Sequence, residues 1–485
     1  MSLTTAFNTA QSSLLTTATQ LATSSRNVAG AGDPSASRKI TVTTTTADGS
    51  ARVVNITRAS DNLLYERTLR ATSASAGQQA VLQGLGQLQL TVGDTTSSTS
   101  PAAKLGALDN ALNTYANAPD NTTLATAVVT AAKDVAIGLN TATMTVQQLR
   151  GTADSKIADA VSQVNDLLTQ FQAQNTAVVV GSENGIDVTD ALDKRDAILS
   201  KIAEKMGVTT VTRAHNDMVV YTDSGATLFE TTARTVSFKS TPVFDAATSG
   251  NSVFVDGVSV SGPSAAMPVQ SGEIAGLTTV RDSLTVTYQN QLDEVARGLV
   301  ATFAESDQSA SGAPTLPGLF TPGSASVPGA LTPGLAGVIA VNSAFDPTLG
   351  GSPALLRDGG ANGAAYVVNT ASAAAYSAHL QATVTTLEAA RTFDPAGQLS
   401  SRTDLATFAA GSVSWLEAQR QSASAASDSA SAVLSQASNA LSTTTGINLD
   451  QEYAAQLELE RSYQASSKLI GVVGQLYDSL FAAIR

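Results

Sequence analysis

Side chains suited to acid–base or metal chemistry are few in this chain. Histidine occurs twice, at His215 and His379, and cysteine is absent. The two histidines lack the i, i+4 spacing that places two ligands on one helix face, so they predict no metal site. His215 stands in a predicted turn between strands, where His tolerates unusual backbone angles, and His379 stands on a predicted helix. We interpret both as structural residues. The absence of Cys also excludes disulfides, thiol nucleophiles and thiolate-ligated metals.

Carboxylate pairs and nucleotide motifs give no stronger signal. Asp293-Glu294 and the pair Asp193 and Asp196 lie on predicted helices among Lys and Arg. This setting indicates solvated helix faces, or i, i+3 and i, i+4 ion pairs, rather than a general acid and base. The chain has no Gly-x-Ser-x-Gly motif and no Gly-Lys dipeptide, and Gly84-Leu85-Gly86 lacks the third Gly of a dinucleotide fingerprint. The sequence therefore predicts no enzyme, no cofactor and no metal site.

Composition narrows the class of protein further. Charged residues make up 14% of the 485 residues, well below the usual quarter, and the net charge is −13 without any basic run. Nucleic-acid binding is therefore not expected. No long uncharged apolar run appears, so we expect no membrane span. Residues 1–20 lack a basic start and an apolar centre, so any export would use a route without a cleaved Sec-type signal peptide.

Both ends of the chain carry an apolar seven-residue repeat. One helix is predicted over residues 1–29, ended by the stretch Gly30–Pro34, and another from Asn448 to the C-terminus. Apolar spacings of three and four sustained over this length are typical of a helix that packs against another helix. We predict that the two ends form an assembly interface through Leu3, Phe7, Leu14, Leu21, Leu459, Tyr463, Ile470, Val473, Tyr477, Leu480 and Ile484.

Between the ends, helical periodicity encloses two segments of other character. Further helices are predicted over about 61–92, 101–115, 121–175 with an interruption at Gly151, 189–206, 271–305, 371–391 and 404–442. Strand-like runs at 40–46 and 52–57 predict one hairpin, and period-two runs within 207–270 predict a small β unit. Recurrent Pro-Gly pairs mark 306–370 as a turn-rich loop or a small irregular subdomain.

The predicted fold class is mainly α with a β insert (α+β), with long terminal helices that form a coiled coil or helical bundle. We predict four parts: a terminal coiled-coil domain of residues 1–40 with 445–485, a helical bundle domain of 41–206 with 271–305 and 371–444, an inserted β domain at 207–270, and the Pro/Gly-rich segment 306–370.

Particular runs resemble bacterial flagellar axial proteins. Gly446–Tyr453, which continues as Leu459–Ile470, resembles their C-terminal signature. Two internal segments are similar to the family of flagellar hook-associated protein 1: Leu192–Leu199 followed by the 208–230 hairpin, and Ser271–Leu277 followed by Arg281-Asp282 and Tyr288–Asp293. Asp346-Pro347 and Leu356–Gly360 are similar as well. The Thr-Pro-Gly-Tyr element usual after the first helix is missing, because Ser25–Ser35 stands there, so its local contacts are not carried over.

The resemblance implies a structural role outside the cell, at the junction of the flagellar hook and filament, after export through the flagellar secretion channel. It implies self-assembly into a helical ring, contacts with the flagellar hook protein and with hook-associated protein 3, and an export chaperone that binds the C-terminal helix. Each terminal helix alone is marginal in water, so we expect both to order fully only on assembly. The alternatives are another axial protein, namely hook-associated protein 3 or a divergent flagellin, and a secreted adhesin or effector that binds a ligand through 207–270.

Overall fold

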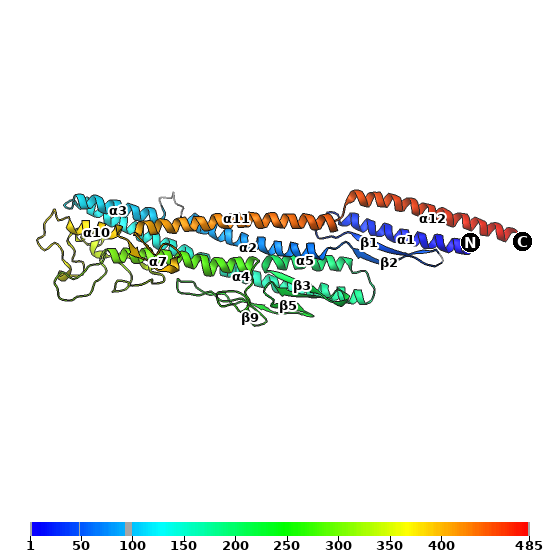
Figure 1. Ribbon diagram of the computed structural model, residues 1–485, viewed down its shortest axis with the longest axis horizontal. Coiled ribbons are helices and arrows are strands. Elements are labelled where there is room, and N and C mark those ends of the chain that lie inside the picture. The colour runs from blue at the N-terminus through cyan, green and yellow to red at the C-terminus, as the bar shows by residue number, and fades with distance from the viewer. Residues whose placement is uncertain (1, 48, 93–98, 484–485) are drawn as a thin grey trace.

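The chain folds into a long rod with both termini at one end (Figure 1). The computed structural model describes residues 2–47, 49–92 and 99–483. At the end that holds the termini, helix α1 (Leu3–Gly30) lies between helix α12 (Leu449–Ala483) and an antiparallel hairpin. The hairpin consists of β1 (Lys39–Thr45) and β2 (Ala51–Arg58). These four elements are called the terminal unit below.

The rest of the rod is a bundle of helices, and its bounds follow the predicted segments closely. Its main helices are α2 (Asn62–Val92), α3 (Pro101–Asn117), α4 (Thr122–Glu183), α5 (Thr189–Lys205), α6 (Glu273–Thr279), α7 (Thr285–Thr302), α10 (Ala378–Glu388) and α11 (Leu405–Thr445). A π-helical turn, Val280–Leu284, joins α6 to α7. α2 packs along α11 for much of the rod, and α4 lies beside α3 and α5.

Two of the predicted helices differ from the observed ones. The predicted break at Gly151 is wrong, because α4 runs through it as one helix of 62 residues. A glycine inside a helix costs only about 1 kcal/mol, which packing on both sides of this position offsets. The predicted helix 371–391 is shorter than expected, because residues 371–377 form turns in which Ser372 has a φ of 52°. A helix cannot include a residue in that left-handed region.

Helix starts are set by local side chains. Asn121 accepts hydrogen bonds from the amides of Thr123 and Leu124 at the start of α4. Ser100 caps α3 ahead of Pro101, whose missing N–H needs no partner at that position. These caps fix where helices begin before any tertiary contact forms.

The β insert lies on one side of α4 and α5 (Figure 1). One antiparallel sheet has the order β3 (Val208–Thr212), β4 (Met218–Thr222), β5 (Thr227–Glu230) and β6 (Thr232–Ala233). A second has the order β7 (Val236–Ser237), β8 (Phe254–Val255) and β9 (Val258–Ser259). The predicted fold class, mainly α with a β insert, is confirmed.

The Pro/Gly-rich segment 306–370 is built of short elements at the end of the rod opposite the termini. They are β10 (Phe320–Thr321), α8 (Leu335–Val338), β11 (Ala340–Val341) and α9 (Leu355–Asp358). β10 pairs with β11, and a further short pair, β12 (Arg391–Thr392) with β13 (Arg402–Thr403), precedes α11. Side chains of this segment, Phe320 and Phe345 among them, are buried in the bundle core.

The apolar interior falls into two clusters along α4. One gathers around Leu139 and Leu149 with α3, α7, α10 and α11, and the other around Ile157 and Phe171 with α5 and the β insert. The polar network of Arg150, Asp154 and Arg281 lies between them, with an Arg281–Asp154 distance of 2.7 Å. Arg150 Nε also donates to the carbonyl of Arg281, so these charged groups are buried but paired.

One helix, α4, is long and apolar enough to cross a membrane by length and composition, with a window of mean hydropathy 1.3. The expectation of no membrane span stays a prediction. The core helix of a globular protein passes the same test, and 44% of that window is buried inside the fold.

Candidate assembly interface

The two predicted seams face each other within one chain. α1 and α12 pack side by side along the terminal unit. Val473 is buried in the seam, and most of the other predicted positions are half-buried: Leu3, Phe7, Leu14, Leu21, Leu459, Ile470 and Tyr477. Tyr463 and Leu480 are exposed, and Ile484 lies outside the described residues. The sequence pattern therefore identified the pairing helices, and the role of these residues in assembly stays a prediction.

Hydroxyl-bearing side chains of α1 and α12 meet across the seam. Ser13 Oγ lies 3.2 Å from Ser466 Oγ, and Thr4 Oγ1 lies 3.0 Å from the Tyr477 hydroxyl. Ser466 is buried, as are Ala10, Thr16, Thr17, Thr23, Ser24 and Asn27 of α1. These hydroxyls hydrogen-bond to one another across the two helices, and Ser466 is buried where it does so.

The hairpin explains why α1 buries so many polar residues. Ser12 and Thr16 both donate hydrogen bonds to the carbonyl of Ala51, the latter at 2.8 Å. Further along, Asn27 Nδ2 donates to the Lys39 carbonyl at 2.9 Å while its Oδ1 accepts from the Lys39 amide at 2.8 Å. α1 is thus covered on two sides, by α12 and by the hairpin, and hydrogen bonds satisfy the buried side chains of Thr16, Ser24 and Asn27.

Glu452 ties the start of α12 to both neighbouring elements. It is buried, and its carboxylate accepts from Ser24 Oγ and from Arg38 Nε, each at 2.7 Å. Burial raises the pKa of Glu452, but these hydrogen bonds outweigh burial and hold the pKa below its ordinary value. A carboxylate in the first turn of a helix also interacts favourably with the helix dipole.

A second carboxylate, Asp193 of α5, joins the terminal unit to the bundle. It accepts hydrogen bonds from the Ser37 amide at 3.0 Å, from Ser37 Oγ at 2.6 Å, from Arg58 Nη1 at 2.9 Å and from Lys39 Nζ. Arg58 also pairs with Asp196 at 2.6 Å. Burial raises the pKa of Asp196 despite the nearby cations.

Of the two predicted settings of these carboxylates, the solvated helix face is wrong for three of them, whereas an i, i+3 ion pair is found between Glu294 and Arg297. Asp193, Asp293 and Glu294 are buried, and each is paired with a cation or with backbone amides. The i, i+3 spacing that the sequence shows is compatible with either environment, because it does not reveal what covers the helix. One signal could have indicated that these carboxylates are buried in ion pairs. This chain has few charges, and four of its cations lie close to the ends of helices and strands: Arg26, Arg38, Lys39 and Arg58.

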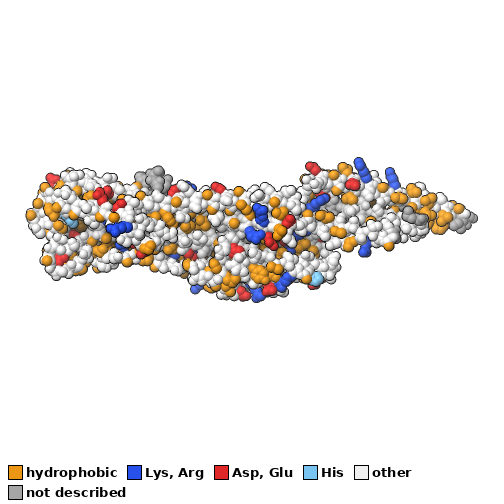
Figure 2. Space-filling model, viewed as in Figure 1, with side chains coloured by type: hydrophobic (Ala, Val, Ile, Leu, Met, Phe, Trp, Pro, Cys, Tyr) orange, Lys and Arg blue, Asp and Glu red, His pale blue; other side chains and the backbone are white. Residues whose placement is uncertain are grey.

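An apolar stripe remains uncovered on α12. Leu469, Val472, Leu476 and Leu480 share one flank of the helix beside the α1 seam, and each is between 46% and 53% exposed. Figure 2 shows hydrophobic side chains on this end of the rod, with few charged ones toward its tip. Exposed apolar stripes of this kind mark interaction surfaces.

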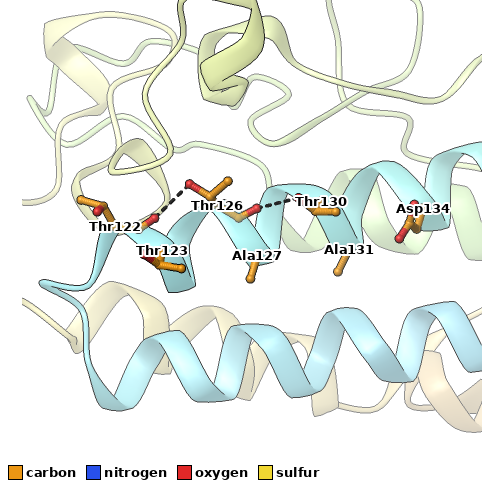
Figure 3. A pocket seen from close by; sticks show the side chains of 7 residues that line it. All are labelled: Thr122, Thr123, Thr126, Ala127, Thr130, Ala131 and Asp134. Atoms are coloured by element: carbon orange, nitrogen blue, oxygen red, sulfur yellow. Dashed lines mark hydrogen bonds between the residues drawn. The ribbon is translucent and has the colours of Figure 1, made fainter.

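Other places that could do chemistry carry weaker features. A shallow hollow of about 620 Å³ lies along the first turns of α4 and is lined by Thr122, Thr123, Thr126, Ala127, Thr130, Ala131 and Asp134 (Figure 3). Thr126 and Thr130 donate their hydroxyl hydrogens to carbonyls one turn earlier in the same helix, at 2.9 and 3.0 Å. These hydroxyls are engaged within their own helix and do not face a base.

The two histidines lie where the sequence predicted. His215 is exposed in a short turn with a φ of 56°, as the turn interpretation requires. His379 is half-buried on α10, and burial lowers its pKa. Within the described part of the chain, no three His, Cys, Asp or Glu side chains gather in a way that could hold a metal ion.

Comparisons with known proteins identify the central part of the chain. Residues 85–316 match the protein family described as the Flagellar hook-associated protein FlgK helical domain. Among solved structures, the chain is similar to the flagellar hook junction protein FlgK from Burkholderia pseudomallei, with 22% identity and a TM-score of 0.42. That alignment covers 53% of this chain and 47% of the Burkholderia chain, about half the length of each. None of the curated proteins matches the chain.

The family match includes α3 to α7 and the β insert, and it leaves α1, the hairpin and α12 outside. It contains both internal segments, Leu192–Leu199 and Ser271–Leu277, on which the resemblance to hook-associated protein 1 rested. The resemblance is therefore confirmed over residues 85–316, just under half of this chain, which match the flagellar hook-associated protein FlgK helical domain.

Proposed function

We propose that this chain is a structural subunit of the bacterial flagellum, placed at the junction between hook and filament. The observation that carries the proposal is the match of residues 85–316 to the FlgK helical domain. The proposed role needs no catalysis, cofactor or nucleic acid. It requires a rod that can pack side by side with its own copies, and a chain with 14% charged residues has few like-charge repulsions to oppose such packing.

We propose that the terminal unit is the part that assembles, through the seam residues predicted above. Its α12 flank exposes an apolar stripe that a neighbouring subunit can cover. A contact that joins two different surfaces of identical copies, and repeats without closing, produces a helical ring. The flagellar hook protein would lie on one side of this ring and hook-associated protein 3 on the other.

The same stripe supports two further parts of the proposal. Before assembly it would expose leucines to water, so an export chaperone that covers α12 would prevent aggregation. We also propose that α1 and α12 order fully only on assembly, after passage through the flagellar secretion channel to the outside of the cell. Full amide protection of both helices in the free monomer would contradict this.

We propose that the four predicted parts act as the working units: residues 1–40 with 445–485 as the inner assembly domain, 41–206 with 271–305 and 371–444 as the bundle, and 207–270 and 306–370 as outward additions. The hairpin packs on α1, so we propose that residues 41–58 act with the inner assembly domain rather than with the bundle.

The test is electron microscopy of cells in which residues 452–485 are deleted from the protein, with flagellin assayed in the medium. The proposal expects bare hooks and flagellin lost to the medium. Full-length filaments would contradict it and favour another axial protein or a secreted adhesin.

A matched pair of point variants removes the ambiguity of a large deletion. Val473→Glu places a charge in the buried seam, whereas Gln475→Glu places the same charge on the exposed side of α12. We expect Val473→Glu to shed flagellin and Gln475→Glu to keep normal filaments. Equal behaviour of the two variants would show that the seam is not the assembly element.

A further inference from the structure

The hairpin of the terminal unit has an apolar face that no described part of the chain covers. Ile40, Val42 and Val54 are between 42% and 57% exposed. Ile40 and Val42 alternate with Lys39 and Thr41, which lie on the side of β1 that is less exposed. Their side chains therefore point away from α1.

A β-bulge adds the third member of this face. Val42 pairs with Asn55 and Thr43 with Val53, so Val54 is left between them without a partner. A bulge redirects one side chain and increases the local twist of the strand. Ile40–Thr43 and Val53–Thr57 carry no charged residue, and the charge on this face is the exposed Arg52, which pairs with Thr44 nearer the turn.

The apolar stripe of α12 matches this face in chemistry and spacing. Residues 469–477 carry no charge, like the part of the hairpin face formed by Ile40, Val42 and Val54. Ile40 and Val42 are about 7 Å apart along a strand, and Val472 and Leu476 are about 6 Å apart along a helix. Two neighbouring stripe residues can therefore contact two neighbouring hairpin residues at once.

The two surfaces cannot meet within one chain. α1 separates α12 from the hairpin as the middle layer of the terminal unit (Figure 1). We propose that the outer face of the hairpin receives the α12 stripe of a second copy of this chain. This inference rests on the proposed assembly role and adds the hairpin as its second contact. Because the two surfaces differ, the contact is heterologous and leaves a free stripe and a free hairpin on each growing assembly.

Engineered cysteines test the contact directly, since the chain has none of its own. Full-length chains that carry Val42→Cys are mixed with chains that carry Val472→Cys and oxidised, both as purified protein at rising concentration and on cells that express both. The control partner is Asp478→Cys, which lies on the other side of α12. We expect about tenfold more intermolecular adduct with Val472→Cys than with Asp478→Cys, because a bound contact raises the local thiol concentration.

An internal pair shows that oxidation works. Ser13→Cys with Ser466→Cys replaces two hydroxyls that lie 3.2 Å apart across the seam of one chain. If this pair closes while Val42→Cys and Val472→Cys give no more adduct than the control, the proposed contact is refuted. Filament formation scored in the deletion strain reports on the proposed function separately, so failure of one proposal is distinguishable from failure of the other.

A charge exchange gives a second readout. Val42→Asp and Val472→Lys are each expected to shed flagellin into the medium, because each puts one unpaired charge into the contact. The double variant is expected to recover filaments, since the two opposite charges then face each other across neighbouring copies. A double variant no better than the worse single variant would overturn the assignment of these two residues to one contact.

Discussion

Removing the charge of Asp193 is predicted to loosen the terminal unit from the bundle without unfolding the bundle itself. Asp193→Asn keeps the shape of the side chain but leaves Lys39 and Arg58 without their shared carboxylate. The side chains of Asp193 and Lys39 are only 8% and 7% exposed, so water cannot replace the lost partner. The control is Asp190→Asn, one turn away on the same helix, where the side chain is 62% exposed.

The free energy lost in Asp193→Asn depends on the partners that Lys39 and Arg58 keep. Breaking a buried ion pair by removing one partner costs about 3–5 kcal/mol when nothing compensates. Here Arg58 keeps Asp196 at 2.6 Å, and Lys39 keeps the Ser37 carbonyl at 3.1 Å. We therefore expect a loss of about 2–4 kcal/mol for Asp193→Asn, and less than about 1 kcal/mol for the exposed pair of Asp190.

Trypsin can measure this loss, since Arg38 and Arg58 stand at the roots of the hairpin. When opening is fast relative to cleavage, the cleavage rate follows the population of the open form. A loss of about 3 kcal/mol then raises the rate about 150-fold, whereas Asp190→Asn raises it less than about fivefold. Fluorescence of Trp415, which packs against the bundle core on α11, should keep its unfolding midpoint in both variants. Equal cleavage of the two variants would refute the argument that Asp193 holds the joint.

The remaining predictions concern the bundle. Burial raises the pKa of Asp293 to about 6, so the folded chain binds this proton more tightly than the unfolded chain does, and stability from this group rises as the pH falls from 7 to 5. In denaturant titrations, the free energy of unfolding of the wild type should rise by about 1 kcal/mol relative to Asp293→Asn between pH 7 and pH 5. The lowered pKa of His379 acts in the opposite direction, but both proteins contain His379, so its effect cancels in the comparison. No difference in slope between the two proteins would contradict the buried position of this carboxylate. Gly276→Ala should destabilise by about 1–3 kcal/mol, because the added methyl would overlap the Gly77 carbonyl of α2. In Gly86→Ala the added methyl meets open space within a helix, so this variant should stabilise the protein by about 0.5–1 kcal/mol. Thermal unfolding midpoints of Gly276→Ala and Gly86→Ala that shift in the same direction would refute this packing argument.

Most helix positions were predictable because their signals are local. Ser100 with Pro101 and Asn121 fix helix starts through their own side chains, and apolar spacing fixes the face that is buried. Gly151 and the stretch 371–377 show where local signals fail. A tolerated glycine and a turn with Ser372 in the left-handed region depend on what packs around them.

The candidate site was predictable only in part. The seven-residue repeat identified α1 and α12 as paired helices, because the repeat needs a partner helix to bury it. It could not show that the hairpin also covers α1, which turns Thr16, Thr23 and Asn27 inward and leaves the leucines half-buried. Glu452 and Asp193 gave no distinct signal, since a carboxylate on a helix looks the same in sequence whether water or an arginine faces it.

Local sequence signals set the elements of this protein and their order: two terminal helices with matching seams, a bundle of long helices, and a β insert. Periodicity and caps act over a few residues, so they are written in the sequence directly. The tertiary structure alone decided which surfaces remain open. Burial depends on contacts between segments as distant as Ser24 and Glu452, and no local pattern encodes them. The uncovered α12 stripe and hairpin face exist because α1 separates them, and that is a property of the packed layers.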